Sequence, residues 1–244
     1  MPKRKQVLLI DAVAWLPAYP ASHPLRDVGG WFRRHLAGAS NTDLRVLNAE
    51  ADLLPALQNG AHGVIISGSP RDAWADDPIN DRLCEFVRAC RDRDVPVLGV
   101  CYGHQILGRA LGGVVAPHPR GLEVGNTTVE LTPAGVASPL FEGVPKRIEV
   151  LSSHADAVSD LPAECGLLVK GDFTPIQGFH WRGRLLGVQF HPEHDPASLG
   201  FVWSVRRELW RDKVAFDLDR VLDEMQPTPF GGRILRNFVE RIVP

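Results

Sequence analysis

The residues of this chain best suited to chemistry begin with a cysteine between glycines. Cys101 lies in the run Gly99-Val100-Cys101-Tyr102-Gly103, after an apolar segment at 95–100 and before a stretch with helical spacing. A strand, a sharp turn and a helix with a nucleophile at the turn form a nucleophile elbow, here with Cys in place of Ser. The glycines let the backbone bend without Cβ clashes. We expect the thiol to be exposed above the sheet edge, where the N-terminus of the helix favours the thiolate.

A base for this cysteine is found in residues 187–193, which read GVQFHPE. In extended chain, side chains two residues apart point the same way, so His191 and Glu193 share a side. Pro192 between them discourages a helix and keeps that geometry. A cysteine nucleophile needs an imidazole to take its proton, and the imidazole needs a group that fixes its tautomer. We therefore predict that Cys101, His191 and Glu193 act together.

A metal site is the other interpretation of the same stretch. His191, His194 and Asp195 are residue types that bind metals. Pro192 and the missing ligand pattern favour the three-residue arrangement instead. We therefore predict no metal, and we expect no cofactor because the sequence carries no P-loop or other ATP-binding signature.

The elements that must position these residues alternate in the first half of the chain. We predict strands at 6–11, 43–48, 63–67 and 95–100, and helices at 31–36, 78–93 and 105–111. This alternation is typical of a doubly wound parallel sheet, whose function lies at the carboxyl ends of the strands. Gly68 and Cys101 fall at such ends. The long segment Trp15–Gly30, with Trp15 and Tyr19, is expected to form the rim of a pocket.

The second half changes character, with short segments separated by Pro, Gly or Asp turns. We predict strands at 126–131, 147–151, 166–170, 176–181 and 184–190, which suggest antiparallel additions to the sheet. The residues after 195 are charged and helical. The fold class is thus an α/β domain with a doubly wound, mostly parallel sheet and antiparallel additions over 1–195, and a C-terminal helical extension at 196–244 packed on the same domain.

Composition excludes several classes of partner. A net charge of −2 disfavours nucleic acid and anionic membranes, which need a concentrated positive field. No apolar run approaches the length of a transmembrane helix. The four cysteines are irregularly spaced, which is typical of a reduced, cytoplasmic protein.

Several motifs occur in order along the chain: SGSP, GVCYGHQILGRALGG and GVQFHPEH. Together they resemble the glutaminase domain of the class I (triad-type) glutamine amidotransferases, most of all the free-standing members related to GMP synthase. The resemblance covers residues 6–194 and implies the flavodoxin-like fold of that family. It also implies that Cys101 is the nucleophile, that His191 is the general base and acid, and that Glu193 orients the imidazole.

The same resemblance assigns two further groups of residues. It implies an oxyanion hole formed by the backbone N–H groups of Gly68 and Tyr102, in agreement with the logic of the elbow. It also implies that the glutamine substrate is held by a set of residues from three segments, namely Gln105, Glu123, Ser153, His154 and Asp156.

Three functions stay open at this point. The first is a glutaminase that hydrolyses the side-chain amide of glutamine through a γ-glutamyl thioester and passes ammonia to an acceptor or a separate synthase subunit. The second is a self-sufficient γ-glutamyl peptidase or hydrolase whose small-molecule substrate is a γ-glutamyl conjugate. The third is a binding module without turnover, which the presence of Cys101, His191 and Glu193 together disfavours.

Overall fold

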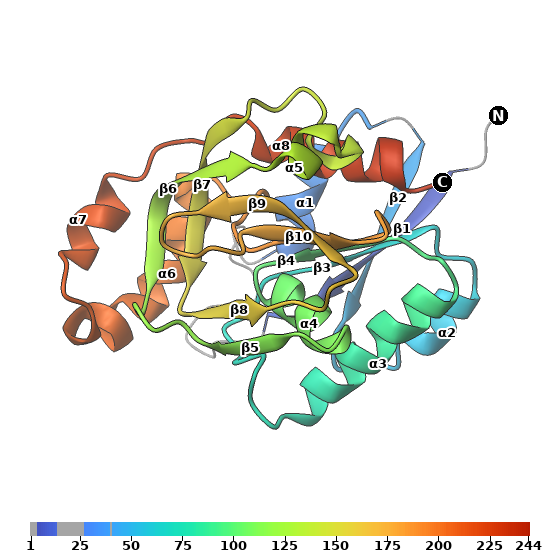
Figure 1. Cartoon of the computed structure of the whole chain (residues 1–244), viewed down its shortest axis with the longest axis horizontal. Coiled ribbons are helices and arrows are strands. Elements are labelled where there is room, and N and C mark those ends of the chain that lie inside the picture. Colours follow the sequence, from blue (N-terminus) through green and yellow to red (C-terminus); the bar gives the residue numbers. More distant parts are fainter. Residues whose placement is uncertain (1–3, 14–26, 40) are drawn as a thin grey trace.

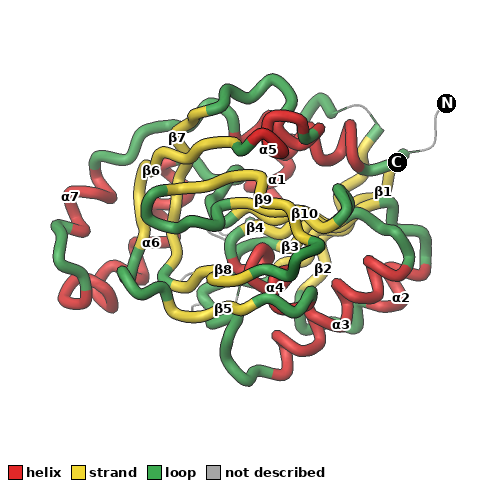
Figure 2. Tube along the Cα trace, viewed as in Figure 1, coloured by secondary structure: helices red, strands yellow, loops and turns green. Residues whose placement is uncertain are grey.

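The computed structural model describes residues 4–13, 27–39 and 41–244, and within these ranges nine strands form one continuous sheet (Figures 1 and 2). The neighbouring parallel strands are, in order, β2 (Thr42–Asn48), β1 (Lys5–Asp11), β3 (Gly63–Ile66), β4 (Val97–Val100) and β11 (Leu185–Val188). The sheet continues antiparallel through β10 (Gly178–Trp181), β9 (Cys165–Gly171), β6 (Glu123–Leu131) and β7 (Arg147–His154). A separate two-stranded sheet consists of β5 (Val114–Pro117) and β8 (Asp156–Asp160).

Helices cover both faces of the parallel strands, as Figure 1 shows. One face carries α1 (Val28–Leu36) and α8 (Gly231–Asn237), and the other carries α2 (Leu54–Gln58), α3 (Pro78–Asp92) and α4 (Tyr102–Ala110). The remaining helices are α5 (Pro133–Ala137), α6 (Pro196–Trp210) and α7 (Leu218–Asp223), with short helical turns at Pro139–Phe141, Arg211–Lys213 and Phe238–Ile242. The expected α/β class, a doubly wound parallel sheet with antiparallel additions, is confirmed.

The apolar runs form central strands because both of their faces are buried. In β1, Val7 and Leu9 pack in the cluster that contains α1 and α8, while Leu8 and Ile10 pack in the cluster that contains α3 and α4. All four side chains are fully buried. A strand covered on both sides must be apolar at every position, and each such side chain contributes roughly 1.5–3 kcal/mol of transfer free energy.

Helix α3 begins where its sequence signals place it. The Asp77 carboxylate accepts a hydrogen bond from the backbone N–H of Ile79 at 2.9 Å, and Pro78 occupies the first helical position. The cap satisfies one of the N–H groups that lack an intrahelical acceptor, and Pro has no N–H to satisfy.

The last strand differs from the expectation that it is an antiparallel addition. β11 is antiparallel to β10, to which it is joined by a turn at Arg182-Gly183, with φ of 50° and 67°. It is also parallel to β4 and lies at the centre of the sheet. The spacing of strands and turns along the sequence predicts only the hairpin of β10 and β11. The pairing of β11 with β4 joins segments almost ninety residues apart, so local spacing does not predict it.

Other expectations are extended or lie outside the described ranges. The structure adds α2, α5, β5 and β8, which the sequence did not indicate, and it lengthens β6 and β7 so that Glu123 pairs with His154. Residues 14–26 of the segment expected to form a pocket rim, Trp15 and Tyr19 among them, lie outside the described residues. None of the helices in the described ranges combines the length and apolar character needed to cross a membrane.

Candidate active site

Gly68, Cys101 and His191 follow the ends of three neighbouring parallel strands, β3, β4 and β11. The register pairs Val100, the last residue of β4, with Val188, the last residue of β11. The carboxyl ends of parallel strands meet at one edge of the sheet, so these segments converge there. The central position of β11 therefore brings the histidine to the cysteine.

The backbone strain of the elbow lies at Cys101. Its φ of 51° and ψ of −104° are uncommon for a residue with a side chain and cost about 1–3 kcal/mol. The flanking glycines serve a different purpose, because a Cβ on Gly99 would collide with the carbonyl of Gly103, and one on Gly103 would collide with the carbonyl of Ile66. The first turn of α4 therefore packs directly against the ends of β3 and β4.

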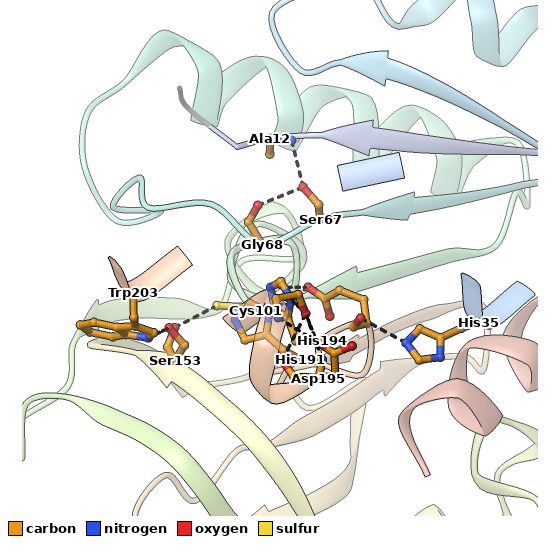
Figure 3. Close-up of polar contacts among 12 residues, drawn as sticks. Ala12, His35, Ser67, Gly68, Cys101, Ser153, His191, His194, Asp195 and Trp203 are labelled. Atoms are coloured by element: carbon orange, nitrogen blue, oxygen red, sulfur yellow. Dashed lines mark hydrogen bonds and ion pairs between the residues drawn. The ribbon is translucent and has the colours of Figure 1, made fainter. Parts of the chain in front are cut away.

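The thiol is not exposed in the way the sequence suggested. Cys101 is 5% exposed, and its Sγ donates to the carbonyl of Ser153 at 3.8 Å. Trp203 of α6 is fully buried, and its Nε1 donates to the Ser153 hydroxyl at 3.0 Å (Figure 3). Helix α6 thus packs beside the sulfur. The sulfur is reached through the cavities described below and not from an open sheet edge.

His191 joins the cysteine to a carboxylate. Its Nδ1 lies 2.8 Å from Oε1 of Glu193, and its ring borders the same cavity as Cys101. Burial opposes a charged imidazole, but the Glu193 carboxylate and the Cys101 sulfur raise the pKa of His191 well above its ordinary value. Burial likewise opposes the Glu193 carboxylate, yet the charge of His191 and the hydrogen bond from it lower the pKa of Glu193 to about 2. This geometry suits transfer of a proton from the Cys101 thiol to His191.

A second set of contacts holds the Glu193 segment. The carbonyl of Glu193 accepts hydrogen bonds from Arg34 and from Nε2 of His35. Nδ1 of His194 lies 3.0 Å from the Ser198 hydroxyl, and burial lowers the pKa of His194 to about 3, so its ring is neutral. His191, Glu193 and His194 also have the ligand types and the proximity of a metal site. Because His191 and Glu193 already bond each other, we keep the prediction of no metal.

Gly68 lies close enough to the imidazole that no side chain fits there. A Cβ on Gly68 would be 2.8 Å from Cε1 of His191 and 3.6 Å from Cβ of Cys101. The Ser67 hydroxyl fixes this peptide, since it accepts from the N–H of Ala12 at 3.0 Å and donates to the carbonyl of Gly68 at 2.9 Å (Figure 3). Tyr102 is the first residue of α4, and such an N–H has no acceptor within its helix. The assignment of these two N–H groups to an oxyanion hole stays a prediction.

Four of the five predicted substrate-binding residues line a cavity beside Cys101, which we call the polar cavity. They are Gln105, Ser153, His154 and Asp156. The side-chain amide of Gln105 donates to the carbonyl of Asp156 at 2.9 Å, which fixes it on the wall.

Glu123, the fifth, does not line this cavity. Its Oε2 accepts hydrogen bonds from Nε2 of His154, from Thr174 and from Gln177. Burial opposes the charge, but these three donors lower the pKa of Glu123. Nδ1 of His154 bonds the carbonyl of Asp156 at 2.9 Å, so both ring nitrogens are occupied. The structure therefore places Glu123 behind His154, where it orients that ring.

A second cavity, which we call the apolar cavity, also borders Cys101. It is bordered by Cys101 and His191, and its apolar lining comes from Val13, Trp31, Pro70, Leu199, Phe201, Val202 and Val205. Arg206 of α6 borders both cavities.

Helix α6 is a part of the site that the sequence did not indicate. The relevant signal is the spacing of Leu199, Val202, Trp203 and Arg206, at i, i+3, i+4 and i+7 along one helical face. That spacing indicates a buried face but not what it covers. The charged residues that follow, at 206–208 and 211–213, are typical of a solvated helix.

Comparison with known proteins places these features in context. The family model "Glutamine amidotransferase class-I" matches residues 32–201, well over half of the chain. The chain is 36% identical over 139 residues to γ-glutamyl peptidase 5 of Arabidopsis thaliana, covering 56% of this chain and 55% of that protein. It is 34% identical over 175 residues to the GMP synthase [glutamine-hydrolyzing] of Aeropyrum pernix, covering 68% of this chain and 32% of that protein. The alignments thus span from a third to about half of these relatives.

The fold has close counterparts among solved structures. The crystal structure of a glutamine amidotransferase from Thermotoga maritima superposes with a TM-score of 0.74, at 22% sequence identity, over 98% of this chain and 97% of that one. At this identity the likeness concerns the fold.

Proposed function

Because this chain belongs to the class-I glutamine amidotransferase family, we propose that it hydrolyses the side-chain amide of glutamine through a γ-glutamyl thioester on Cys101. One observation carries the proposal. His191 is hydrogen-bonded to Glu193 and borders one cavity together with Cys101, at the ends of adjacent strands, and the cysteine borders a second cavity as well. This is the arrangement that nucleophilic acyl transfer requires.

In the first step the Cys101 thiolate attacks the amide carbon. The C–S bond forms, and the oxyanion is stabilised by the N–H groups of Gly68 and Tyr102. His191, protonated because Glu193 and the sulfur raise its pKa, donates its Nε2 proton to the departing nitrogen as the C–N bond breaks. The products of this step are the amine and the thioester.

In the second step water releases the glutamyl group. Neutral His191 takes a proton from the water, whose oxygen attacks the thioester carbon, and the C–S bond breaks to restore the thiolate. Glu193 holds the imidazole through Nδ1 and stabilises its charge in both steps. The balance is one amide and one water converted to one carboxylate and one amine.

The polar cavity is the proposed site of the glutamyl amino and carboxylate groups. Gln105, Ser153, His154 and Asp156 offer polar groups on its wall, and Glu123 supports His154 from behind. We propose that ammonia then passes to a separate synthase subunit. This is supported by the GMP synthase of Aeropyrum pernix, of which the alignment covers only 32%.

A γ-glutamyl peptidase activity is the second candidate. Two observations favour it: a relative is named γ-glutamyl peptidase 5, and a cavity with mostly apolar walls lies next to His191. For either activity we propose a cytoplasmic location, which the four free thiols support.

The experiment that tests the reaction compares wild type with Cys101→Ala on glutamine and on γ-glutamyl amides. Glutamate release should fall by about 10⁴-fold or more in the variant, because no nucleophile remains. Cys165→Ala, which removes a half-buried thiol on β9, is the matched control and should keep wild-type activity. Equal glutamate release by wild type and Cys101→Ala would refute the proposal.

A further inference from the structure

We infer that the apolar cavity is the leaving-group site and that it selects γ-glutamyl amides of apolar amino acids over glutamine. The inference rests on the proposed function and extends it to a substrate class. It is argued from the position of His191, from the walls of the cavity and from an unpaired arginine.

The position of His191 decides on which side the amine departs. The proton on its Nε2 must reach the departing nitrogen, so the leaving group lies on the side of the imidazole. Of the two cavities that meet at Cys101, only the apolar cavity is bordered by His191 and Glu193. The polar cavity carries Gln105, His154 and Asp156 and receives the charged end of the glutamyl group.

The walls of the apolar cavity decide what kind of amine it receives. Trp31 of α1 and Val202 and Val205 of α6 all line this cavity. Apolar surface lowers the free energy of a bound group only if that group is itself apolar. Ammonia is small and polar and gains nothing from such walls, whereas a leucine or phenylalanine side chain does.

Arg206 supplies the remaining contact. Its guanidinium lies over the ring of Trp203, 5.2 Å from the centroid, and it borders both cavities. Within the described ranges it forms no hydrogen bond and no close ion pair, and the acidic side chains that act on its charge are Asp72 and Asp156. A positioned guanidinium without an acceptor is suited to a carboxylate. An amino acid attached through its nitrogen to the γ-carboxyl of glutamate carries such a carboxylate beside the scissile bond.

The first experiment measures kcat/KM of the wild-type protein for glutamine, γ-Glu-Gly, γ-Glu-Leu and γ-Glu-Phe. We expect γ-Glu-Leu and γ-Glu-Phe to exceed γ-Glu-Gly by at least about tenfold, a discrimination that apolar pockets commonly reach. Equal or better turnover of γ-Glu-Gly overturns the inference while leaving the proposed function intact. Absence of Cys101-dependent turnover of every substrate, glutamine included, overturns the proposed function itself.

The second experiment places a charge in the apolar wall. Val202→Asp should lower the ratio of kcat/KM for γ-Glu-Leu to that for γ-Glu-Gly by about tenfold. Leu209→Asp, the same change type at a position 60% exposed on the same helix, should leave that ratio unchanged. If Val202→Asp does not fold, Val202→Thr keeps the volume and should lower the ratio by about threefold. An unchanged ratio in the folded Val202 variant refutes the assignment.

The third experiment tests the arginine with two amides that differ only in the leaving carboxylate. Wild type should prefer γ-Glu-Leu to the γ-glutamyl amide of isopentylamine, and Arg206→Met should reduce that preference by about tenfold, since a charged hydrogen-bonded pair is lost. Arg207→Met is the matched control on α6, because Arg207 pairs with Asp219 and Asp223 instead. If Arg206→Met slows both amides equally, the arginine does not recognise the leaving group.

Discussion

The cavities at Cys101 have two walls that are built in different ways. One wall, which we call the strand-end wall, consists of Gly68, Cys101 and the His191–Glu193 pair. Their positions are set by main-chain pairing and by contacts too close for a Cβ. The other wall is α6, whose side chains Val202 and Arg206 are only partly buried.

The two walls meet different requirements, one for precise positioning of the reacting atoms and one for contact with the leaving group. Reacting atoms must be held to a fraction of an ångström, which backbone at the ends of a buried parallel sheet achieves. A wall that only contacts the leaving group tolerates side-chain changes without moving those atoms. Changes in the strand-end wall should therefore lower kcat, and changes in α6 should mainly alter substrate preference.

Glu193→Gln should give the largest effect in this comparison. It keeps an acceptor for Nδ1 of His191 but removes the charge, so kcat should fall by about 10³-fold. Without the carboxylate the pKa of His191 decreases, so His191 loses its proton at lower pH. The alkaline limb of the pH profile of kcat/KM should move to lower pH accordingly. Glu208→Gln on the exposed face of α6 is the control, and an unmoved limb in Glu193→Gln would contradict the assigned role.

Gly68→Ala and Gly200→Ala apply one substitution to both walls. At Gly68 the new Cβ would lie 2.8 Å from Cε1 of His191, so kcat should fall by about a hundredfold as the ring is displaced. At Gly200 in α6 the nearest atom is Cε of Met225 at 4.0 Å, so the variant should keep its kcat and gain about 0.5–1 kcal/mol of stability. Steady-state kinetics measures kcat of both variants, and denaturant unfolding measures their free energy of unfolding. An equal decrease of kcat in the two variants would contradict the proposed difference between the walls.

His194 joins the two walls, since its Nδ1 bonds Ser198 of α6 while its ring contacts that of His191. Burial lowers its pKa to about 3, so between pH 6.5 and 3 the unfolded chain binds a proton that the folded protein does not. Stability is therefore lost as pH falls through this window, by about 1.4 kcal/mol per pH unit. Unfolding at pH 7 and pH 5 should show wild type losing about 2 kcal/mol more than His194→Gln. Equal losses would contradict a neutral, buried imidazole.

Trp203→Phe should give the smallest effect. It keeps the buried ring of α6 but removes the hydrogen bond from Nε1 to the Ser153 hydroxyl, worth about 1 kcal/mol. The free energy of unfolding should decrease by that amount and kcat/KM by less than about tenfold. Trp181→Phe on β10, remote from both cavities, should change neither; a hundredfold loss in Trp203→Phe would mean that α6 positions the nucleophile.

Local sequence determined much of what lies at each strand end. Apolar runs buried on both faces required strands β1, β3 and β4, and Asp77 with Pro78 fixed the start of α3. The glycines around Cys101 indicated a tight strand-to-helix turn. These features follow from contacts between residues close in the chain, which periodicity and turn chemistry report directly.

The tertiary structure alone decided which elements meet. That β11 enters the centre of the sheet beside β4, and that α6 rather than solvent lies beside Cys101, depends on pairings between segments far apart in sequence. Such pairings depend on the total surface that the two packed segments bury. A local sequence pattern describes only one of these two surfaces. The residue types at the site can therefore be identified from the sequence. Packing alone determines the burial of the thiol, the position of Glu123 behind His154 and the two cavities.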